Sequence, residues 1–137
     1  ECARENAARN GLSQVVDCMA ANVFDLLPQL QKGQYDFIIL DPPAFTKSRQ
    51  TTQRAMAGYK EINYRAMRLL PRGGYLATCS CSHFATEELF RKMLHAAAHD
   101  AGVQLRQIEA RQQSADHPIL WGVEETSYLK FYLFQVV

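Results

Sequence analysis

Long apolar runs are missing from this sequence. The longest aliphatic run is Phe37–Leu40, whereas a helix that crosses a bilayer needs about 20 apolar residues. Residues 1–10 are polar and helix-like, unlike a secretory signal. Together with the unmatched-looking pair Cys79 and Cys81, this favours a reducing, cytoplasmic location and no contact with a membrane.

A strong net charge is also missing. The formal charge is +1 at pH 7, so no broad basic field marks the chain as a nucleic-acid-binding protein. The charge is unevenly spread, however, because residues 47–72 contain a single acid, Glu61. The cations of this stripe are Lys47, Arg49, Arg54, Lys60, Arg65, Arg68 and Arg72. They form either a solvated helix face or a face that contacts phosphates.

A glycine-rich loop is the third absence. The chain has seven glycines, and none are spaced as a loop that cradles a phosphate or a dinucleotide requires. The first predicted element is a helix with no strand before it. We therefore expect residues 1–137 to be the carboxyl-terminal portion of a single doubly wound domain. Its missing first strands would leave a sheet edge that a second copy, in a homodimer, could cover.

What the sequence does contain is an alternation of helix and strand patterns. The predicted helices are Glu1–Asn10, a short one within Asn22–Gln34, one marked by Tyr59, Ile62, Ala66 and Leu69, and one from Thr86 to Gly102. The predicted strands are Gln14–Met19, Tyr35–Asp41, Tyr75–Ser80, Val103–Ala110 and Tyr128–Val137. This order predicts an α/β fold with a mostly parallel sheet. The last strand has no helix before it, so we expect it to run antiparallel.

Two strand ends carry reactive groups, and ligands of such sheets bind beyond the carboxyl ends of the strands. The run Tyr35–Asp41 is apolar throughout, which predicts a strand buried on both faces. After it, Asp41, Pro42 and Pro43 present a carboxylate and carbonyls with few donors, which suits an amino group. Phe45 could stack on a planar substrate. The alternative is a rigid turn in which Asp41 caps a backbone amide and Phe45 joins the core.

The second strand end with reactive groups is Cys79-Ser80-Cys81-Ser82-His83. A zinc site is weakly supported, because no second ligand pair with finger spacing follows. A disulfide between Cys79 and Cys81 would be strained. The remaining interpretations are two buried structural cysteines or a nucleophilic thiol. Cys81 is the better nucleophile candidate, since it lies past the apolar strand and nearer the start of the next helix.

Taken together, these motifs resemble a known family. The segments "ILDPPAF", "GYKEINYRAMRLL", "GGYLATCSCSHF" and "SADHP" occur in the order and at the spacings of bacterial class I S-adenosylmethionine-dependent methyltransferases. They are most similar to the RlmI-type group, which forms 5-methylcytosine in 23S ribosomal RNA. The resemblance implies a Rossmann-like methyltransferase sheet, S-adenosylmethionine as cofactor, 23S rRNA as partner, and no metal.

The resemblance also implies roles for individual positions. Cys81 and Asp41 match catalytic positions, with Cys81 attacking carbon 6 of cytosine and Asp41 holding the base, whereas Cys79 is expected to be structural. The general base is left open between His83 and Asp41. The residues implied in cofactor binding are Asn22, Val23, Phe24, Asp41, Pro42 and Pro43, with Asn22 replacing the acid usual in the family. Those implied in substrate binding are Phe45, Lys47, Arg49 and Arg54.

Two other functions remain open at this point. An amino-group methyltransferase, acting on a base or on protein, would carry an aromatic residue directly after the two prolines, where this chain has Ala44. A non-enzymatic RNA-binding module would lack cofactor binding. Because the glycine-rich motif is not in this chain, we expect the chain by itself to bind S-adenosylmethionine weakly and to be inactive. Micromolar binding in calorimetry would contradict that expectation.

Overall fold

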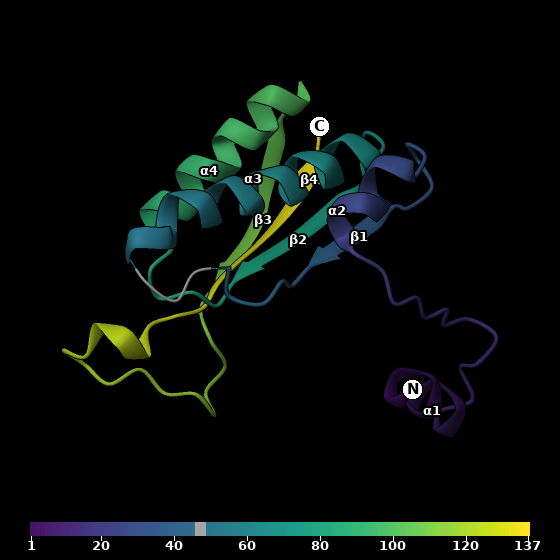
Figure 1. Cartoon of the computed structure of the whole chain (residues 1–137), viewed down its shortest axis with the longest axis horizontal. Coiled ribbons are helices and arrows are strands. Elements are labelled where there is room, and N and C mark those ends of the chain that lie inside the picture. The colour runs from purple at the N-terminus through teal and green to yellow at the C-terminus, as the bar shows by residue number, and fades with distance from the viewer. Residues whose placement is uncertain (46–48) are drawn as a thin grey trace.

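A four-stranded sheet forms the centre of the computed structural model, which describes residues 1–45 and 49–137 (Figure 1). The strands are β1 (Phe37–Leu40), β2 (Tyr75–Ser80), β3 (Leu105–Arg111) and β4 (Lys130–Val136), and their spatial order is β1-β2-β4-β3. β1 pairs with β2 in parallel, whereas β4 runs antiparallel to both β2 and β3. Three strands therefore share one direction and only β4 is reversed, which confirms the predicted α/β sheet with an antiparallel last strand.

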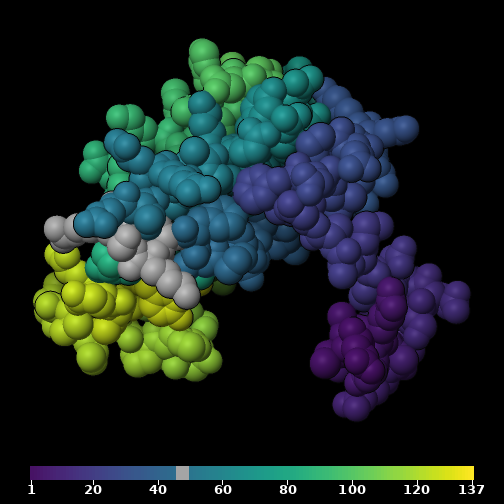
Figure 2. All heavy atoms as spheres, in the orientation of Figure 1, coloured from purple at the N-terminus to yellow at the C-terminus, as the bar shows by residue number. Residues whose placement is uncertain are grey.

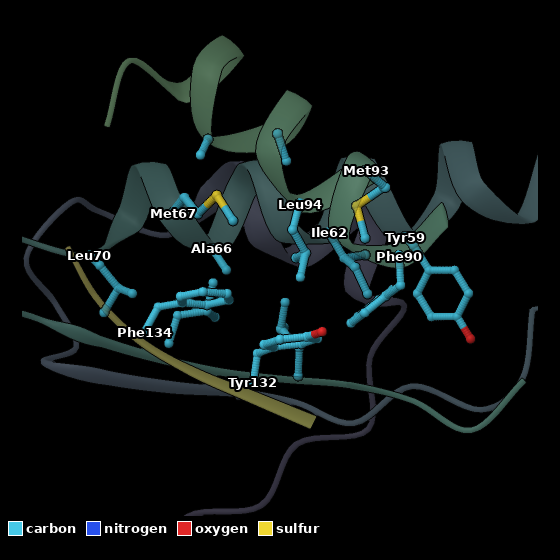
Figure 3. Close-up of a cluster of buried hydrophobic side chains, with 14 of the residues drawn as sticks. Tyr59, Ile62, Ala66, Met67, Leu70, Phe90, Met93, Leu94, Tyr132 and Phe134 are labelled. Atoms are coloured by element: carbon cyan, nitrogen blue, oxygen red, sulfur yellow. The ribbon is translucent and has the colours of Figure 1, made fainter. Parts of the chain in front are cut away.

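Two long helices lie side by side over one face of this sheet (Figure 1). They are α3 (Thr52–Leu69) and α4 (Glu87–Ala101). The shorter elements are α1 (Cys2–Arg9), α2 (Val23–Leu26) and three 3-10 turns, η1 (Leu27–Gln29), η2 (Arg49–Thr51) and η3 (Glu124–Thr126). The core lies between the helices and the sheet, where side chains of α3, α4 and β4 meet (Figure 3). Its largest members include Tyr59, Ile62, Met67, Phe90, Tyr132 and Phe134.

The ends of α4 follow from two residues. The Thr86 hydroxyl accepts a hydrogen bond from the Leu89 N–H at 3.3 Å, so Thr86 is the expected N-cap. Gly102 closes the helix at φ 66°, a left-handed conformation that glycine adopts without steric penalty. Both helix limits are as the sequence predicts.

Two expectations for the strands are wrong. Residues 14–19 form no strand, and Val15 and Met19 are 75% and 74% exposed. An apolar run becomes a strand only where a neighbouring strand takes up its backbone hydrogen bonds, and none of the four described strands pairs with this segment. β1 is also not buried on both faces. Phe37 and Ile39 are 48% and 65% exposed, because the described helices cover only the opposite face of the sheet.

The amino-terminal part stands apart from this sheet-and-helix body (Figures 1 and 2). α1 is joined to α2 by an irregular segment, and the Arg4 guanidinium donates to the Cys18 carbonyl at 3.1 Å within that part. β1 is one edge of the described sheet, and the homodimer that would cover such an edge stays a prediction. Among the described helices, none has the length and apolar character needed to cross a membrane.

Candidate functional site

The carboxyl ends of β1 and β2 lie at the same edge of the sheet, so the Asp41 and Cys81 motifs lie there together. The two strands are parallel neighbours, with Leu40 in register with Thr78. Asp41 follows β1 directly, and Cys81 is the first residue after β2. Parallel neighbours end at the same edge of a sheet, so both groups lie at that edge. The structure thus places both motifs at one edge of the sheet, and that they form one site with the roles assigned to them stays a prediction.

Asp41 presents an exposed carboxylate at this edge. In the described part of the chain it makes no hydrogen bond or ion pair, so the alternative in which it caps a backbone amide is not observed there. Pro42 and Pro43 hold the backbone that follows and carry no N–H to compete for the carboxylate. The Asp41 oxygens are thus available to accept hydrogen bonds from a ligand.

The two cysteines have different surroundings. Cys79 lies inside β2 opposite Phe131, and burial, followed by the negative charges of Asp41 and Cys81, raises its pKa to about 11. Cys79 is therefore a neutral thiol at physiological pH and a poor nucleophile. Cys81 lies beyond the strand, and both cysteines are partly exposed free thiols. The geometry favours Cys81 over Cys79 as the reactive group.

Tyr59 of α3 connects the two strand ends. Its side chain is fully buried, and its hydroxyl accepts a hydrogen bond from the Ser80 hydroxyl at 3.1 Å. Burial raises the pKa of Tyr59, while the hydrogen bonds from Ser80 and from the backbone N–H of Phe45 act in the opposite direction. Ser80 Oγ in turn accepts the Ser82 N–H at 3.4 Å. The Tyr59 hydroxyl therefore bonds the end of β2, and the Phe45 backbone in the loop after β1 acts on its pKa.

Phe45 packs against the core more closely than a free stacking surface would. Its ring centroid lies 4.6 Å from that of Tyr59 and 6.1 Å from that of Phe24. Gly58 makes this possible, because a Cβ at that position would lie 3.3 Å from Phe45 Cδ2. Phe45 thus packs against the core and is also partly exposed.

The segment expected near the cofactor lies next to Phe45. Asn22 caps α2, with its Oδ1 accepting the Phe24 N–H at 3.1 Å and its Nδ2 donating to Asp25 at 2.8 Å. Val23 packs against the core, whereas Phe24 is 41% exposed. The Asn22 amide is thus engaged in local hydrogen bonds, and the open ring of Phe24 is the part of this segment that a ligand can reach.

The basic stripe is only partly available for phosphates. Lys60 pairs with Asp100 at 2.6 Å, and Arg65 pairs with Glu61 at 2.7 Å. Arg54 is exposed in the first turns of α3, close in sequence to the loop after β1. Lys47 lies outside the described residues, and the Arg49 side chain is likewise not described. Of the three predicted phosphate contacts, Arg54 alone can be placed.

Lys130 is the residue that the sequence reasoning missed. It is the first residue of β4, in register with Ser80, and only 8% exposed. Its Nζ donates to the Ser82 carbonyl at 2.6 Å and to the Tyr128 carbonyl at 2.7 Å. The signal was present in the sequence, because strand alternation places Lys130 on the same face as Tyr132, Phe134 and Val136.

A hollow of about 240 Å³ opens beside Lys130 and His83. Thr86, Glu87, Gln112 and Leu129 complete much of its wall. The His117 ring, by contrast, contacts Tyr128 within the loop after β3, where its Nδ1 lies 3.3 Å from the Tyr128 hydroxyl. Of the two histidines considered in the sequence, His83 is thus the one that borders this hollow.

Comparison with known proteins gives the family. The model of the methyltransferase small domain matches residues 1–104. The chain belongs to that methyltransferase family. It is 39% identical over its whole length to "Ribosomal RNA large subunit methyltransferase I" of Klebsiella pneumoniae, of which it covers 35%. It is 44% identical over 95% of its length to the protein of that name from Shewanella amazonensis, of which it covers 34%. The chain thus spans about a third of these methyltransferases.

Solved structures give the fold of the family. A putative methyltransferase complexed with SAH superposes with a TM-score of 0.73 at 18% identity, covering 99% of this chain and 37% of that one. TrmN from Thermus thermophilus superposes with a TM-score of 0.60 at 21% identity, covering 98% of this chain and 32% of that one. At these identities the likeness establishes the Rossmann-like methyltransferase fold of the chain, as the sequence predicted.

Proposed function

We propose that the chain is the site-bearing portion of a cytoplasmic, S-adenosylmethionine-dependent methyltransferase that forms 5-methylcytosine in 23S ribosomal RNA. The family match and the names of the rRNA methyltransferase relatives support the RNA substrate. The observation that carries the chemistry is the placement of Cys81 and Asp41 at the ends of neighbouring parallel strands. An accessible thiol and an uncommitted carboxylate at one edge are what cytosine C5 methylation requires.

The residues present fit the methyl donor. Asp41 offers acceptor oxygens that no described residue occupies, Phe24 offers an exposed ring, and Pro42 and Pro43 fix the backbone beside them. In our proposal these residues, with Asn22 and Val23, hold the donor at the carboxyl edge of the sheet. S-adenosylmethionine, when bound, supplies the electrophilic methyl group.

Carbon 5 of cytosine is a weak nucleophile, and Cys81 is proposed to change that. The Cys81 thiolate adds to carbon 6, which forms a sulfur–carbon bond and makes carbon 5 enamine-like. Asp41 accepts a hydrogen bond from protonated N3 or from the exocyclic amine as charge develops on the ring. After methylation, loss of the carbon 5 proton to a base expels Cys81 and restores the aromatic ring. His83 and Asp41 are the two candidates for that base.

The RNA must present an unstacked cytosine to this edge. Phe45 is partly exposed there, and Arg54 is exposed and available for a phosphate contact. Lys47 and Arg49 complete the proposed substrate-binding group.

A covalent trap in the full-length protein tests the nucleophile. RNA containing 5-fluorocytidine has no carbon 5 proton to lose, so a methylated adduct through Cys81 should persist and appear in mass spectrometry as protein crosslinked to RNA. Cys81→Ala should abolish both the adduct and methylation, while RNA binding remains.

Cys79→Ala is the matched control, because that thiol is two residues away and neutral. It should retain the adduct. Methylation of RNA by Cys81→Ala, or an active enzyme that never gives an adduct, would contradict the proposal and favour the amino-group route.

A further inference from the structure

Lys130 is the one charged residue of β4, and it points into the molecule. It shares its strand face with Tyr132, Phe134 and Val136, and just 8% of its surface is exposed. Burying an ammonium group is unfavourable unless hydrogen bonds and charges compensate for the lost water. The surroundings of Lys130 therefore indicate what the residue does.

Two backbone carbonyls bind the Lys130 ammonium, and they belong to different loops. One is the carbonyl of Ser82, the residue after Cys81, at 2.6 Å. The other is the carbonyl of Tyr128, at the end of the loop that precedes β4, at 2.7 Å. Lys130 thus ties the Cys81 loop to the loop between β3 and β4. An ammonium has three N–H donors, and within the described chain the third has no hydrogen-bond acceptor.

The charged and titratable groups around this point are mostly acidic. Cys81 and Glu87 both attract the Lys130 charge. The Tyr59 hydroxyl of α3 and the Cys79 thiol of β2 interact electrostatically with Cys81, and Asp41 does so with Cys79. His83 borders the same hollow as Lys130 and Glu87. The two groups that interact electrostatically with Lys130, Cys81 and Glu87, are thus both acidic.

We propose that Lys130 is a positioning residue for Cys81: it fixes the loop that carries the thiol through the Ser82 carbonyl, and its positive charge acts on that thiol. That charge favours the thiolate both when Cys81 attacks and when it leaves. Only the reaction assigned to the Cys81 thiolate rests on the proposed function.

The protonation state of Lys130 agrees with this role. Burial lowers its pKa to about 8, while the charges of Cys81 and Glu87 act to raise it. The side chain consequently remains mostly protonated at pH 7. Each of the two charges, ammonium and thiolate, stabilises the other, as linkage requires.

Alkylation of Cys81 by iodoacetamide tests the charge without RNA or methyl donor. The label is assigned to Cys81 by peptide fragmentation, because Cys79 lies on the same peptide. In the full-length protein at pH 7, Lys130→Met should slow Cys81 alkylation by about fourfold, because a close opposite charge favours the thiolate while a more stable thiolate attacks more slowly. Lys130→Arg, which keeps the charge, should react within about 1.5-fold of the wild-type rate.

Lys60→Met is the matched control, since it removes an ammonium that pairs with Asp100 on the surface. It should alkylate at the wild-type rate. A wild-type rate in Lys130→Met, or an equal loss in Lys130→Arg, would overturn the proposal, the second result because it would leave a purely steric role.

A second measurement covers the case in which Lys130→Met does not fold. The titration of Lys130 can be followed by NMR of labelled lysine in the wild type and in Cys81→Ser. Loss of the thiolate should move the Lys130 midpoint to lower pH, and an unchanged midpoint would refute the coupling. Neither measurement involves methylation. If the fluorocytidine adduct is absent while the coupling is present, the proposed function fails and this inference stands.

Discussion

Burial shifts the pKa values of two ionisable groups at the strand ends toward their neutral forms. Burial raises the pKa of Cys79 to about 11 and lowers that of Lys130 to about 8. The shifts have one cause and opposite directions, because the charged form is an anion in one case and a cation in the other. Cys79 is therefore unreactive at neutral pH. Lys130 is still mostly charged there, because its pKa of about 8 lies only a little above neutral pH.

These shifts predict how the free energy of unfolding depends on pH. From about pH 8, folded Lys130 loses its proton while the unfolded chain, with an ordinary pKa of 10.5, still binds one, so stability rises with pH. From about pH 9, unfolded Cys79 loses a proton that the folded state retains up to about 11, so its contribution falls. Tyr132, whose pKa burial raises to about 12, adds a further decrease above pH 10.

Urea unfolding at a series of pH values checks this expectation. Stability should rise between pH 8 and 9, by at most about 1.4 kcal/mol per pH unit, and then level off. Lys130→Met should remove the rise, whereas Cys79→Ala should let it continue above pH 9. A decrease between pH 8 and 9 in the wild type would contradict the burial of Lys130.

At the scale of elements, α3 supports the site through three residues, Gly58, Tyr59 and Asn63. Gly58 leaves room for the Phe45 ring, and Tyr59 contacts that ring and bonds Ser80. The side chain of Asn63, one turn later, donates to the Tyr59 carbonyl at 2.8 Å. The segment "GYKEIN" therefore acts as a support for both strand-end loops.

Gly58→Ala tests whether the Phe45 ring packs against α3, because the effect of helix propensity on stability is known in advance. At an open helical site the change stabilises a protein by about 1 kcal/mol. Here the new Cβ would lie 3.3 Å from Phe45 Cδ2 and 3.5 Å from Cε2, so the ring must shift, and we expect no gain. Ala57→Gly, at the exposed neighbouring position, should lose about 1 kcal/mol in the same urea assay. A gain of that size in Gly58→Ala would show that Phe45 is not held against the helix.

The sequence predicts a structural feature well when the residues that determine it lie within the element itself. β2 covers Tyr75–Ser80 as expected, and Thr86 and Gly102 limit α4, because these signals lie within the element itself. Residues 14–19 and the outer face of β1 were predicted wrongly, since strand pairing and burial depend on neighbours. The contacts of Lys130 depend on the register between β2 and β4, which no local pattern contains.

For the whole molecule, the position of β4 matters most. It lies between β2 and β3 and pairs with both, although it follows them in the sequence. β4 also supplies Tyr132 and Phe134 to the core and Lys130 to the site. The sheet, the core and the Cys81 loop therefore depend on the same seven residues, Lys130–Val136.

Proline substitution tests this dependence. Leu133 is paired with Ala77 on one side and Glu109 on the other. Leu133→Pro removes a backbone donor from an inner strand, so we expect loss of cooperative unfolding in circular dichroism. Ile108 lies at the irregularity between Gln107 and Glu109 of β3, a strand on the edge of the described sheet. Ile108→Pro should be tolerated better, and equal damage from both would contradict the central role of β4.

The order of the strands also bears on how the chain folds during synthesis. As the ribosome extends the chain, β3 emerges before β4, yet among the described strands β3 pairs with β4 alone. β3 and the helix α4 before it can therefore reach the ribosome surface and still lack the strand that joins them to β1 and β2. Assembly of this half of the described sheet must wait for β4, and until then the nascent chain exposes an unpaired edge that favours aggregation or chaperone binding.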